Sequence, residues 1–525
     1  MFPKLCATNN GVIITRDGME DLDVFRLFRS FFPADTSVED ADIVHFLHTY
    51  LTYDANEIKR RSEIVGALQK NSESLLGVER IVAQHKRLSH SLSELGRSQR
   101  PLLFYTYMRH ALEAYIASIE HAQNFFNSDV PAMAEIAGAI CQIRTSSFYV
   151  EVQDCLRRIN AKINPLRNLT LAVNLTEAGQ VAEIGISNIN HSVGILNGLF
   201  NGASTQVNSL CDDVPVKIRS PLVHLEAYIV SQVETQWAAS LKSVMRELKK
   251  IDMEKLCAWR DWLQHIKFYH KGLLLAEKLK QAGVCTCRPE PCDTGIAAEE
   301  MLYPHMALTK RTPVQQTMRF DIGNAVLITG ANSSGKSSVL KALAQNVMLA
   351  QLGCWVPARS LRFIPFKWYF TVFAAGEDRQ IIASRYQQEA EKMMTAVDSA
   401  DADSFVLLNE PFTSTNPKEA AELLCDIITR LSRKGTTLMV VTHLYDVYHL
   451  LLEAGVAVRS YVTGLTSDAD KIVHTYALQE KTPDGLSYAR HLAREYGFSI
   501  DSLVSDRDMA SKLEAFMLEE GAYHA

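Results

Sequence analysis

One octapeptide has the residue types and the spacing of a loop that binds phosphate groups. Gly330-Ala-Asn-Ser-Ser-Gly-Lys-Ser337 matches the pattern G-x-x-x-x-G-K-[ST] in full. Glycines let the main chain turn so that successive N–H groups point at one anion, a lysine reaches the terminal phosphates, and a serine hydroxyl ligates Mg²⁺. The residues expected to hold a nucleotide are Gly330, Asn332, Ser333, Ser334, Gly335, Lys336, Ser337 and Ser338.

The residues around this loop have the pattern that such chemistry requires. The apolar segment Ala325–Thr329 predicts a strand before the loop, and Ser338–Leu352 predicts a helix after it. The N-terminal end of that helix would add its dipole to the anion site. The chain contains no N-K-x-D segment of the kind that binds guanine, which favours ATP over GTP.

Two further predicted strands end in polar residues that could act on a nucleotide. Ser404–Leu408 leads into Asn409 and Glu410. Glu410 is placed to orient or deprotonate an attacking water, although a helix-capping role is the alternative. Asn409 would help Ser337 to hold Mg²⁺ by accepting a hydrogen bond from a metal-bound water; because an amide brings no negative charge, we expect weaker Mg²⁺ retention, by about 1–3 kcal/mol.

A third predicted strand, Thr437–Thr442, ends at His443. In that position a histidine can contact the terminal phosphate or the attacking water, and the alternative is an ordinary histidine at a strand end. Glu410 and His443 are therefore the expected catalytic residues.

Composition restricts the class of protein. The 525 residues carry 54 Lys and Arg against 60 Asp and Glu, a net charge of −6, so any nucleic-acid surface must be local. Ten cysteines are too few for a disulfide framework. The uncharged stretches 184–211 and 342–358 are too polar or too short to cross a membrane. With no leader pattern at the amino terminus, we expect a soluble, cytoplasmic protein without membrane contact.

Periodicity divides the chain into a helical part and an α/β part. Helical spacing covers 39–69, 102–127 and 130–162, and a β-hairpin is expected at 169–190. Residues 221–281 predict one long amphipathic helix able to act as a lever, and 283–295 a linker. Strands and helices alternate from about Met301. The expected domains are 1–215 (helical core with the hairpin), 216–295 (lever and linker), 296–500 (nucleotide-binding domain) and 501–525 (C-terminal helix).

From the loop to the C-terminal part, the order of motifs resembles the MutS family of DNA mismatch repair ATPases. The resemblance is carried by Leu327–Ser337, Ala350–Ala358, Ser384–Glu389, Leu407–Glu410, Thr413–Asn416, Thr442–His443, Tyr476–Leu478, Gly485 and Ser487–Tyr488. It implies an α + α/β fold: a helical core and lever followed by a P-loop ABC-type ATPase domain with a mixed β-sheet. Some 50 residues before the helical core are too few for a mismatch-binding domain, so we expect a short MutS-like protein without classical mismatch recognition.

The resemblance also implies partners and cofactors. ATP and Mg²⁺ would bind at the interface of a homodimer formed through the ATPase domain, with Ser384 of one subunit closing the site of the other and residues 414–416 crossing the interface. Arg385 and Tyr386 replace Thr and Phe of the family pattern. Hydrolysis, slowed by Asn409, would move the helical lever on DNA that is structured or mismatched and bound without sequence specificity.

Two other features leave alternatives open. Residues 242–280 are locally basic and contain Trp259, Trp262, Phe268 and Tyr269, which suits either nucleic-acid phosphates and bases or a solvated helix face over core aromatics. Cys285, Cys287 and Cys292 could hold zinc together with His305, although the spacing is not that of a standard finger. The alternative function is a nucleotide-gated scaffold with weak hydrolysis and a protein partner.

Overall fold

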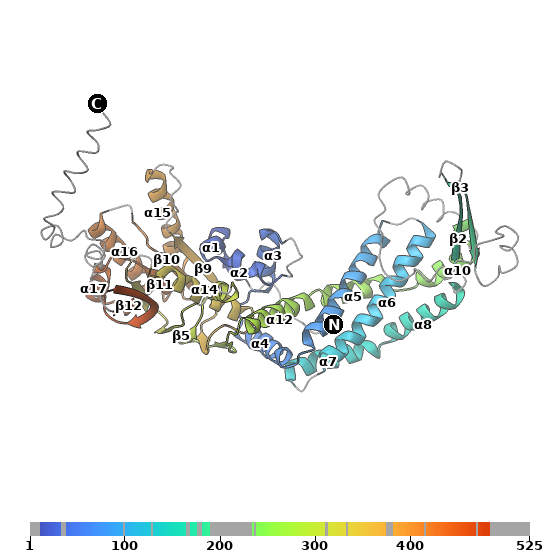
Figure 1. The fold of residues 1–525 in the computed structure, drawn as a ribbon, viewed down its shortest axis with the longest axis horizontal. Coiled ribbons are helices and arrows are strands. Elements are labelled where there is room, and N and C mark those ends of the chain that lie inside the picture. Colours follow the sequence, from blue (N-terminus) through green and yellow to red (C-terminus); the bar gives the residue numbers. More distant parts are fainter. Residues whose placement is uncertain are drawn as a thin grey trace, which may run out of the picture. The chain divides into compact units, whose positions relative to one another are not determined.

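The structure, a computed structural model, describes residues 11–32, 38–97, 100–127, 130–163, 169–175, 181–188, 234–235, 238–309, 313–331, 334–373, 382–413, 416–468 and 471–483. Their contacts divide them into two compact units. Residues 71–270 form the helical unit, and residues 11–70 together with 271–483 form the sheet unit (Figure 1). Among the described helices, none combines the length and the apolar composition needed to cross a bilayer.

The helical unit is a set of long helices with one small hairpin. Its elements are α5 (Ser74–Leu95), α6 (Pro101–Phe125), α7 (Pro131–Arg144), α8 (Ser147–Ile163), β2 (Leu169–Leu175), β3 (Val181–Asn188), α10 (Ala238–Leu248), α11 (Met253–Leu263) and the start of α12 (Ile266–Gln281). The antiparallel pairing of β2 with β3 confirms the expected hairpin. Pro101 and Pro131 stand in the first turn of α6 and α7, where a missing N–H costs nothing.

The single long helix expected up to residue 281 is wrong over the described residues. Three helices stand there, α10, α11 and α12, with breaks at 249–252 and 264–265. Asp252 explains the first break, because its carboxylate accepts hydrogen bonds from the N–H groups of Glu254 and Lys255 and so caps a new helix. The apolar period continues across both breaks, which is why periodicity alone does not detect them.

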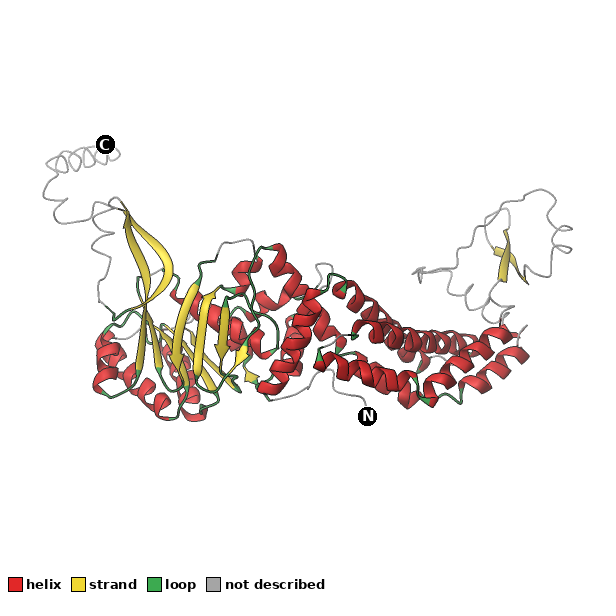
Figure 2. Ribbon diagram, turned by 90° about the horizontal axis from the view of Figure 1, so that it is seen from below, coloured by secondary structure: helices red, strands yellow, loops and turns green. Residues whose placement is uncertain are grey.

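The sheet unit contains a seven-stranded sheet in the order β1-β9-β10-β11-β7-β12-β13. All neighbouring strands are parallel except β12 and β13, so the expected mixed sheet is confirmed. Figure 2 shows the strands side by side. Their bounds are β1 (Ile13–Ile14), β7 (Ala325–Thr329), β9 (Trp368–Phe373), β10 (Ser404–Asn409), β11 (Thr437–Val441), β12 (Val458–Asp468) and β13 (Lys471–Glu480).

Helices cover this sheet because its central strands are apolar on both faces. Every residue of β7 and β11 is buried. Leu327, Leu408 and Val440 pack with α15, α16 and α17 in one cluster, and the alternate residues face the side of α14. The described helices that lie wholly in the sheet unit are α1 (Arg16–Asp21), α2 (Val24–Arg29), α3 (Asp40–Tyr50), α4 (Ala55–Lys70), α13 (Pro304–Leu308), α14 (Lys336–Gln351), α15 (Ile382–Ser399), α16 (Pro417–Arg433) and α17 (Asp446–Glu453).

A second sheet contains part of the expected linker. Its order is β4-β8-β5-β6, with β4 (Glu290–Pro291), β5 (Gly295–Met301), β6 (Gln316–Asp321) and β8 (Ser360–Phe363). Cys287 exchanges main-chain hydrogen bonds of 2.9 and 3.0 Å with Val356, and the N–H of Cys292 donates to the carbonyl oxygen of Phe363 at 2.8 Å. The expectation of a linker over 283–295 is therefore wrong for most of that segment.

The beginning of the described chain belongs to the sheet unit. β1 extends the seven-stranded sheet by pairing Ile13 with Trp368 and Ile14 with Tyr369. Residues 11–70 therefore group with the nucleotide-loop region, whereas the sequence-based boundaries place them in a helical core of 1–215. A strand of two residues leaves no periodic signal, so the sequence does not reveal this pairing.

Candidate nucleotide-binding site

The loop between β7 and α14 has a conformation that only glycine tolerates at two positions. Gly330 has φ = 138°, and a Cβ atom there would collide with the hydroxyl oxygen of Thr463. Gly335 has φ = 88°, and its Cβ would lie 3.3 Å from Cδ1 of Tyr476. Both glycines allow the main chain to approach other parts of the unit closely. Within the loop, the Ser334 hydroxyl donates to the carbonyl oxygen of Ala331 at 2.6 Å and lies 2.6 Å from Thr463 Oγ1.

Lys336 opens α14 with a buried ammonium group. Its side chain is 3% exposed, and its Nζ donates hydrogen bonds to the carbonyl oxygens of Gly330 at 3.0 Å and Ala331 at 2.8 Å. Glu410 Oε1 lies 3.6 Å from the same nitrogen. Burial lowers the pKa of Lys336, and the Glu410 carboxylate partly opposes that shift. The Lys336 ammonium group is buried and bonded to carbonyl oxygens of the loop, so it is placed to bind an anionic group at that loop.

Ser337 and Asn409, the two expected metal ligands, touch each other. The Ser337 hydroxyl donates to Asn409 Oδ1 at 2.7 Å. The pairing follows from topology, because β10 and β7 both flank β11 in parallel and their carboxyl ends meet at one edge of the sheet. Two oxygen atoms so placed fit the preference of Mg²⁺ for oxygen ligands.

Glu410 sits in a strained turn that neighbouring residues hold. Its φ is 51°, and its N–H donates to the carbonyl oxygen of Val441 at 2.8 Å. Two residues later, Phe412 has φ = 62°, and its N–H donates to Glu389 Oε1 at 2.8 Å. Burial raises the pKa of Glu389, although that hydrogen bond opposes the shift. Glu389 thus fixes the turn that presents Glu410, a role that the sequence motif containing it does not reveal.

The structure does not bring every expected residue to this cluster. His443 is exposed just beyond β11, and no hydrogen bond or ion pair in the described structure joins it to Lys336, Ser337 or Glu410. Asn332 and Ser333 lie outside the described residues, as do the loop positions 414–415. Ser384 lies in α15, but its side chain is outside the described set.

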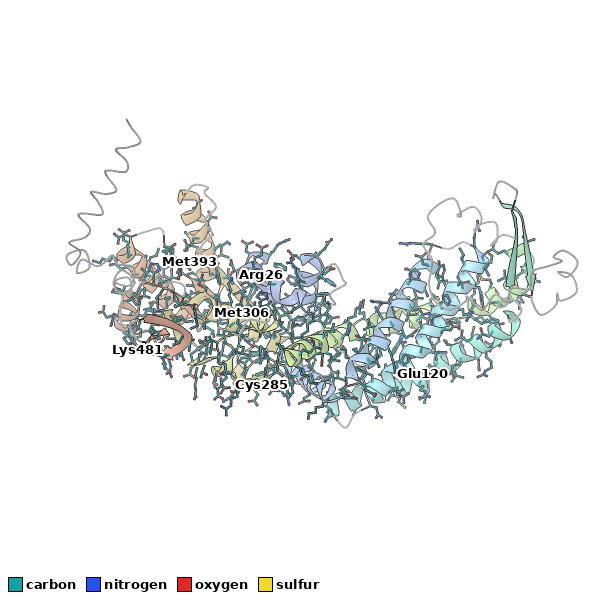
Figure 3. The ribbon with its side chains drawn as sticks, viewed as in Figure 1. Arg26, Glu120, Cys285, Met306, Met393 and Lys481 are labelled. Atoms are coloured by element: carbon teal, nitrogen blue, oxygen red, sulfur yellow. The ribbon has the colours of Figure 1, made fainter. Side chains whose placement is uncertain are left out.

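An apolar pocket of about 320 Å³ adjoins the loop. Gly335 and Ser338 line it together with Tyr303, Met306, Pro313, Val314, Gln316, Val339, Ala342 and Tyr476 (Figure 3 labels Met306). Gln316 holds Tyr476: its Nε2 donates to the Tyr476 carbonyl oxygen at 2.7 Å, and its Oε1 accepts from the Leu478 N–H at 2.9 Å. Tyr476 has φ = 56° and a partly exposed side chain. The sequence analysis identified neither Gln316 nor a role for Tyr476. The Gln316 side chain makes hydrogen bonds that the main chain of a neighbouring strand would otherwise make, and no local sequence pattern predicts such a replacement.

The structure decides two of the open alternatives. The aromatic residues of 242–280 are buried, and the indole N–H of Trp259 donates to Ser118 Oγ at 2.8 Å, so they form core and do not offer stacking surfaces for bases. Within the described residues, no three His, Cys, Asp or Glu side chains gather as metal ligands. Cys285, Cys287, Cys292 and His305 therefore do not form the considered zinc site.

The sheet is mostly parallel, and polar side chains gather beyond the carboxyl ends of its strands. This is the arrangement of α/β domains that bind a ligand at that edge of the sheet. Comparison with known proteins narrows that class. Residues 326–514 match the family model described as MutS domain V. Over these residues the chain is similar to domain V of MutS proteins.

Individual relatives agree with the family model over part of their length. The chain is 31% identical over 191 residues to the DNA mismatch repair protein MutS of Streptococcus equi subsp. equi (strain 4047), covering 36% of the chain and 22% of that protein. It is 27% identical over 255 residues to MutS protein homolog 4 of Mus musculus, covering 46% of the chain and 26% of that protein. The chain thus matches about a quarter of the length of these relatives.

Proposed function

We propose that the chain is a MutS-like ATPase that binds Mg²⁺ and ATP at the loop between β7 and α14 and works on DNA. The observation that carries the proposal is the convergence of Lys336, Ser337, Asn409 and Glu410 at one edge of the sheet. The match to MutS domain V supports ATP as the substrate, since that domain is the ATPase domain of MutS proteins.

The residues of the site divide the work of hydrolysis. The loop N–H groups and Lys336 would hold the phosphates, because the lysine needs only to exchange two carbonyl acceptors for phosphate oxygens. Ser337 and Asn409 would hold Mg²⁺, which supplies charge neutralisation at the phosphates. Glu410 would accept the proton of the attacking water. Its ion pair with Lys336 must loosen to do so, since a γ-phosphate competes for the same ammonium group.

The apolar pocket beside Gly335 is suited to the base of the nucleotide. It opens next to the first turn of α14, where Ser338 and Val339 belong to both the helix and the pocket wall. The ring of Tyr476 offers a flat surface, held in place through Gln316. A phosphate site and an aromatic-lined pocket that share Gly335 have the arrangement that a nucleoside triphosphate requires.

A basic stripe on α10 supports DNA as the partner. Lys242 and Arg246 of α10 and Lys249 directly after it are exposed and spaced by four and three residues; because the Lys249 N–H still donates to the carbonyl oxygen of Met245 at 3.0 Å, the three lie along one face. The carboxylate of Glu247 is engaged by Arg158 at 3.3 Å and by Lys250 at 3.2 Å. A stripe of this kind attracts backbone phosphates without reading sequence. One matched relative is named for DNA mismatch repair, and this proposal extends DNA, but not mismatch reading, to the chain.

The dimer belongs to the proposal as well. Glu410 is about one-third exposed, so one side of the nucleotide site is open to solvent in a single subunit. A second copy, contributing Ser384, would close it. Hydrolysis would then change how two subunits hold each other, and helices such as α12, which continues from one unit into the other, would carry that change outward.

The second candidate, a nucleotide-gated scaffold with a protein partner, is favoured by Asn409. Its amide oxygen already accepts the hydroxyl hydrogen of Ser337, and it brings no charge to a metal. Asn409→Asp separates the two. For an ATPase limited by Mg²⁺ retention, the Mg²⁺ concentration at half-maximal turnover should fall about fivefold or more. An unchanged midpoint together with negligible turnover would favour the scaffold.

The decisive experiment is ATP turnover measured with linear, looped and four-way DNA at two salt concentrations. We expect DNA to stimulate turnover and the effect to weaken with salt. The variant Lys242→Glu/Arg246→Glu/Lys249→Glu should lose stimulation but keep basal turnover. A matched control is Lys255→Glu, which changes a lysine already paired with Asp252 at 3.3 Å. Equal stimulation of the triple variant would reject the α10 stripe as the DNA surface.

A further inference from the structure

The N-terminal segment of the described chain is attached to the helix that begins at the nucleotide loop. Between α1 and α2, the carbonyl oxygen of Leu22 accepts a hydrogen bond from Gln345 Nε2 at 2.8 Å. Asp23 Oδ2 accepts one from Lys341 Nζ at 2.8 Å. Both donors belong to α14, whose first turn contains Lys336 and Ser337. Leu22 and Asp23, which precede their partners by more than 300 positions, thus contact α14.

The same carboxylate oxygen also holds a wall of the apolar pocket. Tyr303 Oη donates to Asp23 Oδ2 at 3.0 Å, and Tyr303 lines the pocket together with Ser338 and Ala342 of α14. Burial raises the pKa of Tyr303, so its hydroxyl stays a donor. Burial opposes ionisation of Asp23, but the hydrogen bond and charge of Lys341 hold its pKa below the ordinary value. Asp23 is therefore a charged acceptor shared by Tyr303 of the pocket wall and Lys341 of α14.

Other contacts fix the main chain of this wall, and the ring of Tyr303 also meets the ring of His305 edge-on, with centroids 6.1 Å apart. The N–H of His305 donates to Gln345 Oε1 at 3.3 Å, and Asn346 Nδ2 donates to the carbonyl oxygen of Leu302 at 2.9 Å. These bonds position residues 302–305 along α14. The hydroxyl of Tyr303, at the far end of a long side chain, is held by Asp23. Asp23 has φ = 53°, a conformation that Asp tolerates better than most residues, and Arg26 lies 3.4 Å from its other oxygen.

We propose that Asp23 is a positioning residue for the nucleotide base. By joining Tyr303 to Lys341 it sets the width of the pocket between the tyrosine ring and α14. The inference rests on the proposed function, because it assigns the pocket to the base. It separates two parts of the substrate: the base depends on Asp23, whereas the triphosphate depends on Lys336 and Ser337.

The test compares ATP with inorganic tripolyphosphate in calorimetric titrations of the full chain. In Asp23→Ala and in Tyr303→Phe, the Kd for ATP should rise about three- to tenfold, the size of one lost hydrogen bond. The Kd for tripolyphosphate and the kcat at saturating ATP should stay within about twofold. Asp23→Asn should be intermediate, since its amide oxygen can still accept from Tyr303. The double variant Asp23→Ala/Tyr303→Phe should be no weaker than the single variants, because both remove the same bond.

Asp17→Ala is the matched control. Asp17 lies in the same N-terminal segment and pairs with Lys392 at 2.8 Å, but both side chains are largely exposed. It should leave both dissociation constants unchanged. Unchanged ATP affinity in Tyr303→Phe, which leaves the main chain of α1 and α2 untouched, would overturn the inference. So would an equal weakening of ATP and tripolyphosphate. A wild-type chain that binds neither ligand would instead reject the proposed function, and this inference with it.

Discussion

The helical unit and the sheet unit bury polar side chains in different ways. The helical unit has a mainly apolar and aromatic core; an example is the pair Trp259 and Trp262, stacked at 4.7 Å. In the sheet unit, buried polar side chains join distant segments. Gln351 of α14, for instance, donates to the carbonyl oxygens of Thr52 at 2.9 Å and Phe366 at 2.8 Å. Apolar contacts have no preferred direction, whereas hydrogen bonds fix the positions of the segments that they join, so we expect the chemistry to reside in the sheet unit.

If the sheet unit carries out ATP hydrolysis, substituting its proposed general base should stop hydrolysis without preventing ATP binding. In Glu410→Gln we expect turnover to fall by about 10²- to 10⁴-fold while ATP stays bound, because a lost general base slows proton transfer without removing phosphate contacts. Single-turnover hydrolysis and a binding titration check both halves of the expectation. Glu419→Gln, an exposed change in the first turn of α16, serves as the control. Wild-type turnover in Glu410→Gln would show that another group is the base.

The next largest effect concerns binding. Lys336→Met should weaken ATP binding about a hundredfold or more, by removing the charge that meets the phosphates. Its melting temperature should change little, because burial already disfavours the charged lysine in the folded state. Calorimetry and thermal melting measure the two effects. Full retention of ATP affinity would reject the phosphate-loop assignment.

A pH experiment addresses the helical unit. Burial lowers the pKa of His85 to about 4; the charge of Lys267 adds to the shift, and a hydrogen bond with the main chain of Arg260 opposes it. Between about pH 6.5 and 4 the unfolded chain binds a proton that folded His85 does not, so stability falls as the pH falls. The loss should reach at most roughly 3 kcal/mol. His85→Gln should be less sensitive over this range in denaturant titrations. An identical pH profile for both proteins would contradict the shift.

The smallest expected effect is a loss of stability in the helical unit that leaves ATP turnover unchanged. Ser118→Ala removes the acceptor of the buried Trp259 N–H and should cost about 1–2 kcal/mol of unfolding free energy. ATP turnover well below the melting temperature should not change. The control is Ser93→Ala on the exposed side of α5, which should be neutral. A large loss of basal turnover in Ser118→Ala would show that the helical core also sets the geometry of the chemistry.

The sequence predicts the parts of the site that follow strand order. Ser337, Asn409 and Glu410 come together because each follows or ends a buried parallel strand, and such strands deliver their carboxyl ends to one edge. Asp23, Tyr303 and Gln316 are not predictable in this way. Their roles depend on single side-chain bonds between segments far apart in the chain, which neither periodicity nor a local motif encodes. The breaks that flank α11 were likewise hidden by a continuous apolar period.

The two-residue strand β1 has a consequence for the timing of synthesis. Its partner in the sheet, Trp368, is made more than 350 residues later. At about 5–20 residues per second, the amino-terminal segment would wait roughly 20–70 s on the ribosome before its neighbour exists. During that interval Ile14, which is buried in the folded chain, lacks the strand that it pairs with. Chaperone capture of the nascent chain should therefore include the segment around Ile14.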